Sequence, residues 1–477
     1  MIANVLNRQF VLDQLEQVKR GLEMGMAEDR RGGEAPPGAE GLSGDDFREA
    51  LAQLEDADAR ERAGSSGQAG FDAPAADRRG DTAPDLDSVA FISHDAILSN
   101  VQSALEEYLE SQEPELLIDD GEAAGDRRGG SGETPMVTGR RLRDPGRNAP
   151  SDDRRVGEKF SITDIGWISS LVAQGVRRLR GKHPFNDTPA PPRAIADRAR
   201  ILVVGDWGTG IPRAARVGGQ MRAIIDQGRA ERLEQHAVHL GDVYYSGWPK
   251  EYEKRFLPHW PVRLAEAGEI TSWSLNANHD MYAGGHGYFG TLLRDPRFAA
   301  HGGSSYFSVS NSHWRILGLD TGYDEGKLHG SQSQWVAEQA AEARVAGQKL
   351  MLLSHYQLFS PYEKAGAELR ELLGPVLGGG GVHSWLWGHE HREVLYGPHL
   401  GLRFSACLGN GGVPAYMTHG EGDPLPAPAT YQNRARMRKG FESWAYFGFA
   451  VLDFDGPRIV LRLVDENGHT HHRQVVE

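Results

Sequence analysis

Five short strings in the chain carry side chains that bind metal ions, and each string ends an apolar run. They are Gly205-Asp206, Gly241-Asp242-Val243-Tyr244-Tyr245, Asn278-His279-Asp280, Ser354-His355 and Gly388-His389-Glu390-His391. Their side chains offer oxygen and imidazole nitrogen donors, whereas the whole chain has one Cys. This donor set favours iron, manganese, zinc or cobalt over copper(I) or an iron–sulfur centre.

Such a cluster suits one reaction class in particular. A carboxylate can bridge two cations about 3.5 to 4 Å apart, and the pair then stabilises the attacking and leaving oxygens of a displacement at phosphorus. Coordination also lowers the pKa of water from 15.7 towards about 7, which supplies a metal-bound hydroxide near neutrality. The residue types therefore predict metal-assisted hydrolysis of phosphoesters.

The strings need a scaffold that brings them together, and the pattern after residue 200 provides one. Strand-like and helical runs alternate there, which is typical of a layered α/β domain. The apolar runs that stop at the five strings are 201–204, 236–240, 271–275, 349–353 and 385–387. In open α/β sheets, ligands bind where the carboxyl ends of the strands release their loops. We therefore expect the five strings to converge at one edge.

The order of these strings resembles that of the calcineurin-like metallophosphoesterase family. The match covers roughly residues 199 to 465 and consists of Gly-Asp, Gly-Asp, Asn-His-Asp, His and Gly-His-x-His, each after a predicted strand. The resemblance implies an α/β fold, a four-layer α/β/β/α sandwich of two mixed sheets. It also implies a binuclear metal centre at the strand ends.

The chain departs from the commonest family pattern in two places. Asp206 is followed by Trp207 and Gly208 where most members have Asp-x-His, but Tyr245 stands three residues after Asp242. That combination resembles the purple acid phosphatase branch, in which a tyrosinate replaces the histidine and favours Fe(III). The neighbouring Tyr244 is a competing candidate. Ala277 stands where the family usually has Gly, a small change if the local φ is negative.

The resemblance implies a role for each site residue. The first metal would take Asp206, Asp242, Tyr245 and His391, and the second would take the bridging Asp242 with Asn278, His355 and His389. His279 would assist the leaving group or stabilise the phosphoryl group, and Asp280 would orient that imidazole and keep it protonated. The two metals would be Fe(III) and a divalent iron, zinc or manganese ion, with Mn/Mn or Zn/Zn as alternatives.

Charge divides the chain into two parts. The formal net charge is −14 over 477 residues, but residues 1–160 sum to −15 and the remainder to +1. We predict an acidic, low-complexity, partly disordered helical region over 1–195, with helices near 2–22, 45–62, 93–111 and 162–180. The metallophosphoesterase domain would span 196–477. The N-terminal arm is a candidate for binding a protein partner.

Several classes are excluded by composition. No stretch of about 18 uncharged apolar residues appears, so we expect no membrane span. The first 20 residues lack the unbroken apolar segment of a secretory signal, and one Cys forms no intramolecular disulfide, so the expected compartment is the cytoplasm.

Three functions remain open from the sequence. The preferred one is a phosphomonoesterase that acts on a small phosphorylated substrate, in the manner of an acid phosphatase. The alternatives are a phosphodiesterase or nuclease of the same superfamily, the only case that implies a nucleic-acid partner, and a non-catalytic scaffold.

Overall fold

The computed structural model describes residues 95–103, 181–362, 366–415, 423–439 and 442–477, together with 19, 48, 51–52, 54–56 and 59. Within the predicted helices 45–62 and 93–111, residues 48, 51–52, 54–56, 59 and 96–103 are helical. The predicted helix 162–180 lies outside the described residues. Residues from Gly181 to Glu477 belong to one compact unit, which includes 181–195. The boundary at 195/196 stays a prediction.

The first sheet of this unit has six strands in the order β16-β15-β14-β2-β3-β4. It is mixed, because β2, β3 and β4 are parallel whereas β14, β15 and β16 form antiparallel pairs. The strands are β2 (Ala199–Val204), β3 (Glu234–His239), β4 (Thr271–Ser274), β14 (Gly448–Asp455), β15 (Arg458–Asp465) and β16 (Thr470–Val476).

The second sheet has eight strands in the order β1-β5-β6-β7-β8-β10-β9-β11, and its centre, β6 to β10, is parallel. Its strands are β1 (Arg193–Ala194), β5 (Phe307–Ser310), β6 (Trp314–Gly318), β7 (Lys349–Ser354), β8 (Ser384–Trp387), β9 (Glu393–Tyr396), β10 (Phe404–Leu408) and β11 (Ala429–Gln432). A separate hairpin pairs β12 (Arg436–Lys439) with β13 (Glu442–Ala445).

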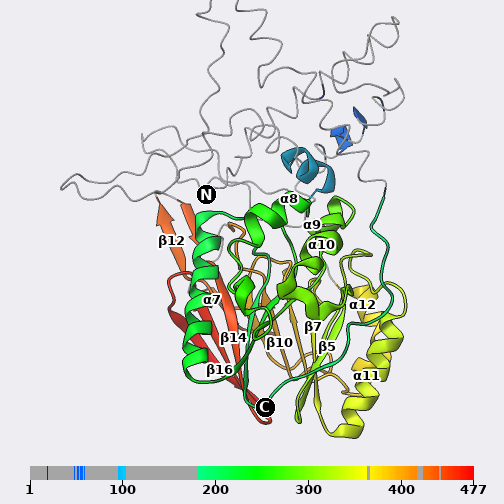
Figure 1. Cartoon of the computed structure of the whole chain (residues 1–477), viewed down its shortest axis with the longest axis vertical. Helices are drawn as coiled ribbons and strands as arrows, with labels where there is room; N and C mark the ends of the chain where they lie inside the picture. Colours follow the sequence, from blue (N-terminus) through cyan, green and yellow to red (C-terminus); the bar gives the residue numbers. More distant parts are fainter. Residues whose placement is uncertain are drawn as a thin grey trace, which may run out of the picture. The chain divides into compact units, whose positions relative to one another are not determined.

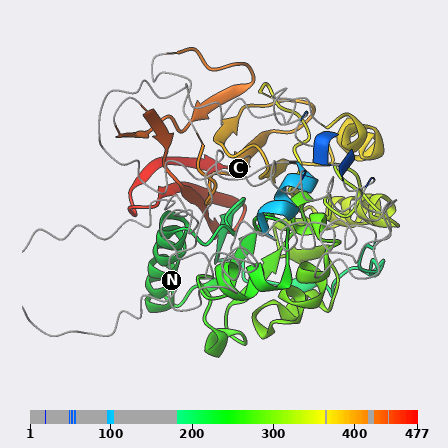
Figure 2. The ribbon, with the colours of Figure 1, turned by 90° about the horizontal axis from the view of Figure 1, so that it is seen from above.

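Helices cover the outer faces of both sheets, on opposite sides in Figures 1 and 2. Helix α7 (Pro212–Ala230) contacts the six-stranded sheet, and α11 (Gln332–Ala346) contacts the eight-stranded one. The remaining helices are short: α8 (Pro249–Glu251), η2 (Tyr252–Phe256), η3 (Leu264–Glu266), α9 (Asn278–Tyr282), α10 (His286–Gly290), η4 (Leu292–Arg294), η5 (Pro296–His301), α12 (Ala367–Leu372) and α13 (Gly374–Gly378).

The largest apolar core lies between the two sheets. Ile201 and Val203 of β2 belong to it together with Met351 and Leu353 of β7. Because side chains alternate along a strand, Leu202 and Val204 face the other way, towards the helix layer. A second core joins the eight-stranded sheet to its helices and includes Val336 of α11. The layers therefore run helix, sheet, sheet, helix, and the predicted α/β/β/α sandwich is confirmed.

No helix within the described residues is long and apolar enough to cross a membrane.

Candidate metal centre

All five predicted strings follow strands whose carboxyl ends meet at one edge of the sandwich. Asp206, Asp242 and Asn278 follow β2, β3 and β4 of one sheet, and His355, His389 and His391 follow β7 and β8 of the other. The five strings therefore converge at one edge, as expected from the sequence. The two facing sheets supply the two halves of the site.

Two groups of side chains at this edge could each hold a metal ion. One consists of Asp242, His355 and His389, and the other of Asp206, Asp242 and His391. Within each group the donor atoms lie within 4.8 Å of one another. Because Asp242 belongs to both groups, it is placed to bridge two ions.

The first group centres on the Nε2 atom of His355. This atom lies 3.0 Å from Asn278 Oδ1, 3.1 Å from His389 Nδ1 and 3.4 Å from Asp242 Oδ2. The other ring nitrogen, Nδ1, donates a hydrogen bond to the carbonyl of Leu240 at 3.1 Å. A carbonyl only accepts, so the neutral ring carries its proton on Nδ1 and leaves Nε2 free for a cation.

The second group includes a tyrosine, and it is Tyr244. Its hydroxyl oxygen lies 3.1 Å from Asp206 Oδ1, 3.1 Å from Asp242 Oδ2 and 3.0 Å from His391 Nε2. The structure therefore favours Tyr244 over the expected Tyr245 at this place. The ring of Tyr245 instead lies 5.0 Å from the guanidinium of Arg255.

The local backbone explains why Tyr244 takes this position. Val243 forms an isolated parallel bridge with Gly208, and the amide of Tyr244 donates to the Gly208 carbonyl. In the loop fixed by this bridge, the Tyr244 hydroxyl lies 3.1 Å from Asp242 Oδ2. The main-chain amide of the next residue, Tyr245, donates to Glu251 instead.

The backbone is strained at four of the predicted metal ligands. Asp206, Asp242, His389 and His391 have φ values of 56°, 75°, 69° and 46°. Residues other than Gly rarely adopt this left-handed backbone conformation, and those that do adopt it cluster at functional sites. The fold therefore maintains a costly conformation at the four residues that point their donor atoms into the cluster. By contrast, Ala277 has a φ of −140°, so its Cβ is tolerated.

Two buried carboxylates hold the loop that carries Asp242 and Tyr244. Asp280 accepts hydrogen bonds from the amides of Asp242 (3.0 Å) and Val243 (3.2 Å). Glu251 accepts from the amides of Tyr245 (2.5 Å), Ser246 (3.1 Å) and Trp248 (2.8 Å). We name these two side chains the loop clamp.

The contacts of Asp280 in the loop clamp differ from those expected from the sequence. Its carboxylate accepts from main-chain amides and from the Tyr252 hydroxyl, and its described contacts do not include the His279 ring. The ring nitrogen Nδ1 of His279 is instead bonded to the carbonyl of Tyr245 at 2.5 Å. His279 lies beside the cluster, since its amide donates to Asp242 Oδ1 at 3.0 Å and its ring centroid is 4.4 Å from that of Tyr244.

Burial and mutual charge govern the ionisation of the cluster. Burial raises the pKa of Asp242, but the neighbouring His355 and His279 outweigh it and hold that pKa well below its usual value. Burial lowers the pKa of His355, yet Asp242 and Asp206 raise it to about 9. Burial also raises the pKa of the Tyr244 phenol, lowers that of His279 and raises that of Asp280 to about 8. The buried carboxylates thus require positive charge beside them.

Two features of the site escaped sequence reasoning. Glu251 lies six residues beyond Tyr245, in the short helix α8, and nothing in the local pattern marks it. Gly388 and Gly409 border Asp206, where an added Cβ would come within 2.6 and 2.9 Å of its Oδ2 atom. Tyr244 did not escape it, because the sequence offered this residue as a competing candidate beside Tyr245.

Taken together, the fold and site define a class: a two-sheet sandwich with a buried group of carboxylates and imidazoles at the strand ends. The sequence profile of the calcineurin-like phosphoesterase family matches residues 199–393. That stretch contains every predicted ligand. The resemblance seen in the sequence is confirmed at this level.

Two solved structures are similar to the chain at low sequence identity. The inner membrane complex anchor GAP50 of Plasmodium is 14% identical, with a TM-score of 0.43, and the match covers 59% of this chain and 89% of that one. A dimetal phosphatase from Danio rerio is 13% identical, with a TM-score of 0.39 and coverage of 61% and 99%. No curated protein matches the chain.

Proposed function

We propose that the protein is a dimetal phosphomonoesterase. The observation that carries this proposal is the pair of candidate metal groups that share Asp242. In our assignment, one ion is held by Asp206, Asp242, Tyr244 and His391, and the other by Asp242, Asn278, His355 and His389. The assignment differs from the sequence-based one in a single residue, Tyr244 for Tyr245.

The residues present fit two cations. Asp206 and Asp242 are fully buried, and buried carboxylates need compensating positive charge. The donors are hard oxygens and imidazole nitrogens, which suit iron, manganese or zinc. The hydrogen bond from His355 Nδ1 to Leu240 orients Nε2 towards the cluster, as expected for a metal-binding ring.

Bound ions would polarise the phosphoryl group and lower the pKa of water. The chain itself supplies position and proton transfer. His279 lies beside Tyr244. In this proposal its imidazole transfers a proton to the leaving oxygen, a role generally worth about 10² to 10⁴ in rate. Asp280 acts through the Asp242 loop and is a positioning residue.

A tyrosine ligand points to Fe(III) at the first position, with a divalent iron, zinc or manganese ion at the second. Metal analysis of the purified protein together with its visible spectrum tests this assignment. A colourless, fully active enzyme containing only manganese or zinc would remove the iron assignment and leave the two-metal site intact.

The substrate class is tested by comparing 4-nitrophenyl phosphate with bis(4-nitrophenyl) phosphate. We expect kcat/KM for the monoester to exceed that for the diester, and both to disappear after metal removal. A preference for the diester would support the phosphodiesterase alternative. Hydrolysis of neither, by a protein with its metals bound, would contradict the enzyme proposal. The cytoplasmic location expected from the sequence stays a prediction.

A further inference from the structure

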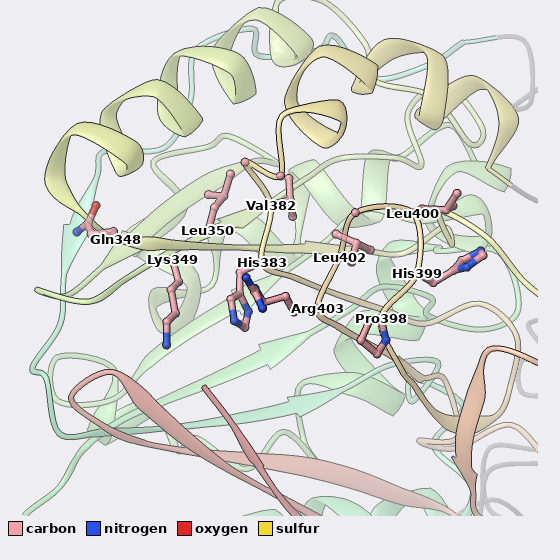
Figure 3. Close-up of a pocket in the computed structure, with 13 residues that line it drawn as sticks. Gln348, Lys349, Leu350, Val382, His383, Pro398, His399, Leu400, Leu402 and Arg403 are labelled. Carbon is pink, nitrogen blue, oxygen red and sulfur yellow. The ribbon is translucent and has the colours of Figure 1, made fainter.

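A pocket at the starts of the parallel strands lies away from the metal centre (Figure 3). Its volume is about 740 Å³, and its lining residues include Lys349 and His383 but none of the predicted ligands. The Lys349 ammonium donates to the carbonyl of Pro457 at 3.0 Å, and His383 Nε2 lies 2.9 Å from the main-chain oxygen of Glu477. Both groups therefore already have partners. The contacts that bear on the metal centre lie beside the ligands themselves.

One such contact links Asn278 to Tyr282, the first and last residues of helix α9. The amide nitrogen Nδ2 of Asn278 donates a hydrogen bond to the Tyr282 hydroxyl oxygen at 2.9 Å. Residues four positions apart lie on the same face of a helix, so this short helix itself places the phenol beside the amide. Asn278 is only 3% exposed, so its amide depends on the protein for hydrogen-bond partners.

This hydrogen bond determines which end of the Asn278 amide faces the metal centre. An amide oxygen accepts hydrogen bonds and can bind a cation, whereas the amide nitrogen only donates. With Nδ2 directed to Tyr282, Oδ1 lies 3.0 Å from His355 Nε2, the atom at the centre of the first candidate metal group. An amide rotated by 180° would direct its NH₂ group at that position and would repel a cation.

Tyr282 also contacts the residue to which we assign proton transfer. Its ring centroid lies 4.7 Å from that of His279, at an interplanar angle of 48°. This contact uses the ring of Tyr282, whereas the contact with Asn278 uses the hydroxyl. Tyr282→Phe removes only the hydroxyl, so this one substitution separates the two contacts.

We propose that Tyr282 is a positioning residue of the metal centre, whose hydroxyl holds the Asn278 amide with Oδ1 towards the ion. This ion is the one assigned to Asp242, Asn278, His355 and His389, and we call it the asparagine-bound ion. The inference rests on the proposed two-metal site and adds to it a residue outside the assigned ligands. Loss of such an outer hydrogen-bond partner generally costs about 10- to 100-fold in metal affinity.

Calorimetric titration of the metal-free full chain with Mn²⁺ tests the inference. Tyr282→Phe should bind the asparagine-bound ion at least about tenfold more weakly and the other ion with unchanged affinity. At saturating Mn²⁺, its kcat for 4-nitrophenyl phosphate should equal that of the unaltered protein, because the ring contact with His279 is retained. A lower kcat with unchanged Mn²⁺ affinity would overturn the inference, since Tyr282 would then act through His279.

A double-mutant cycle identifies the amide as the partner of the hydroxyl. In an Asn278→Ala protein, the further change Tyr282→Phe should leave Mn²⁺ affinity unchanged, because no amide remains to be held. Additive losses of affinity would contradict the inference. The matched control is Tyr306→Phe, which removes the hydroxyl of another buried tyrosine, bonded to the Asp187 carbonyl at 2.8 Å. It should leave the affinity for both ions unchanged even if Tm falls.

Failure of this inference and failure of the two-metal proposal give different results. Equal Mn²⁺ affinity in Tyr282→Phe and Tyr306→Phe would overturn the role of Tyr282 and leave the two-metal proposal intact. An unaltered protein that holds fewer than two metal ions, both as purified and after titration, would contradict the two-metal proposal and the role of Tyr282 with it.

Discussion

The loops that carry Asp206 and Asp242 reach similar geometry by different means. In both, one carboxylate oxygen accepts a main-chain amide and the other faces the cluster. Asp206 Oδ2 accepts from His389 at 2.7 Å, and Asp242 Oδ1 accepts from His279 at 3.0 Å. The surroundings differ, because glycines enclose Asp206 whereas the clamp side chains Asp280 and Glu251 hold the Asp242 loop.

This difference predicts which substitutions would damage each half of the site. Around Asp206 the constraint is space, so any added Cβ at Gly388 or Gly409 is harmful. Around Asp242 the constraint is hydrogen bonding, so isosteric changes of a carboxylate are harmful although they leave the volume unchanged. Substitutions chosen by these two criteria separate the halves.

The largest effect is expected from Asp242→Asn, because this residue belongs to both candidate metal groups. We expect kcat/KM to fall by more than about 10³-fold, well beyond the 10- to 100-fold that loss of an outer partner costs. Metal analysis should show both ions reduced, whereas Asp206→Asn should deplete one. Two retained ions in Asp242→Asn would contradict the shared ligand.

Gly388→Ala tests the space around Asp206. The added Cβ would lie 2.6 Å from Asp206 Oδ2, so the carboxylate must move, and we expect a loss of about 10²-fold in kcat/KM. The control is Gly219→Ala in α7, where an added Cβ meets nothing within 4 Å. It should raise stability by about 0.5–1 kcal/mol and leave activity unchanged. Equal activity of the two variants would show that Asp206 tolerates displacement.

Asp280→Asn tests the clamp. The amide nitrogen of Asn would face main-chain N–H donors that now bond a carboxylate, so the Asp242 loop should loosen. We expect metal affinity to fall about 10- to 100-fold, measured by titration of metal-free protein, and Glu251→Gln to act in the same direction. Glu253→Gln alters an exposed neighbour on η2 and should leave affinity unchanged. A clamp variant with unaltered metal affinity would assign Asp280 a different role.

Much of this architecture was predictable from the sequence. Apolar runs that each end in a ligand string predicted the strands, and the parallel arrangement of β2, β3 and β4 explains why Asp206, Asp242 and Asn278 meet. The four-layer sandwich followed from the family resemblance and is confirmed. Three of the five strings contain a glycine, namely Gly205, Gly241 and Gly388, but the contact of Gly388 with Asp206 was not visible in them.

The errors have a common physical origin. Tyr245 was assigned from the family resemblance and Asp280 from its adjacency to His279, whereas side-chain direction is set by the backbone of an irregular loop. The bridge between Val243 and Gly208 fixes the loop in which the Tyr244 hydroxyl reaches the cluster, and Asp280 accepts from the amides of the Asp242 loop. Both interactions join residues more than 30 positions apart, so no local pattern reports them.

The smallest effect on activity is expected from Tyr244→Phe. Comparing this variant with Tyr245→Phe discriminates between the two candidate tyrosine ligands. Removing the Tyr244 hydroxyl deletes one oxygen that lies within 3.1 Å of both carboxylates, and we expect about a tenfold loss of kcat/KM. If Fe(III) occupies this position, the tyrosinate-to-iron absorption band should vanish in Tyr244→Phe and persist in Tyr245→Phe. Loss of the band in Tyr245→Phe alone would return the ligand to Tyr245. It would also show that the bridge at Val243 does not determine which tyrosine faces the metals.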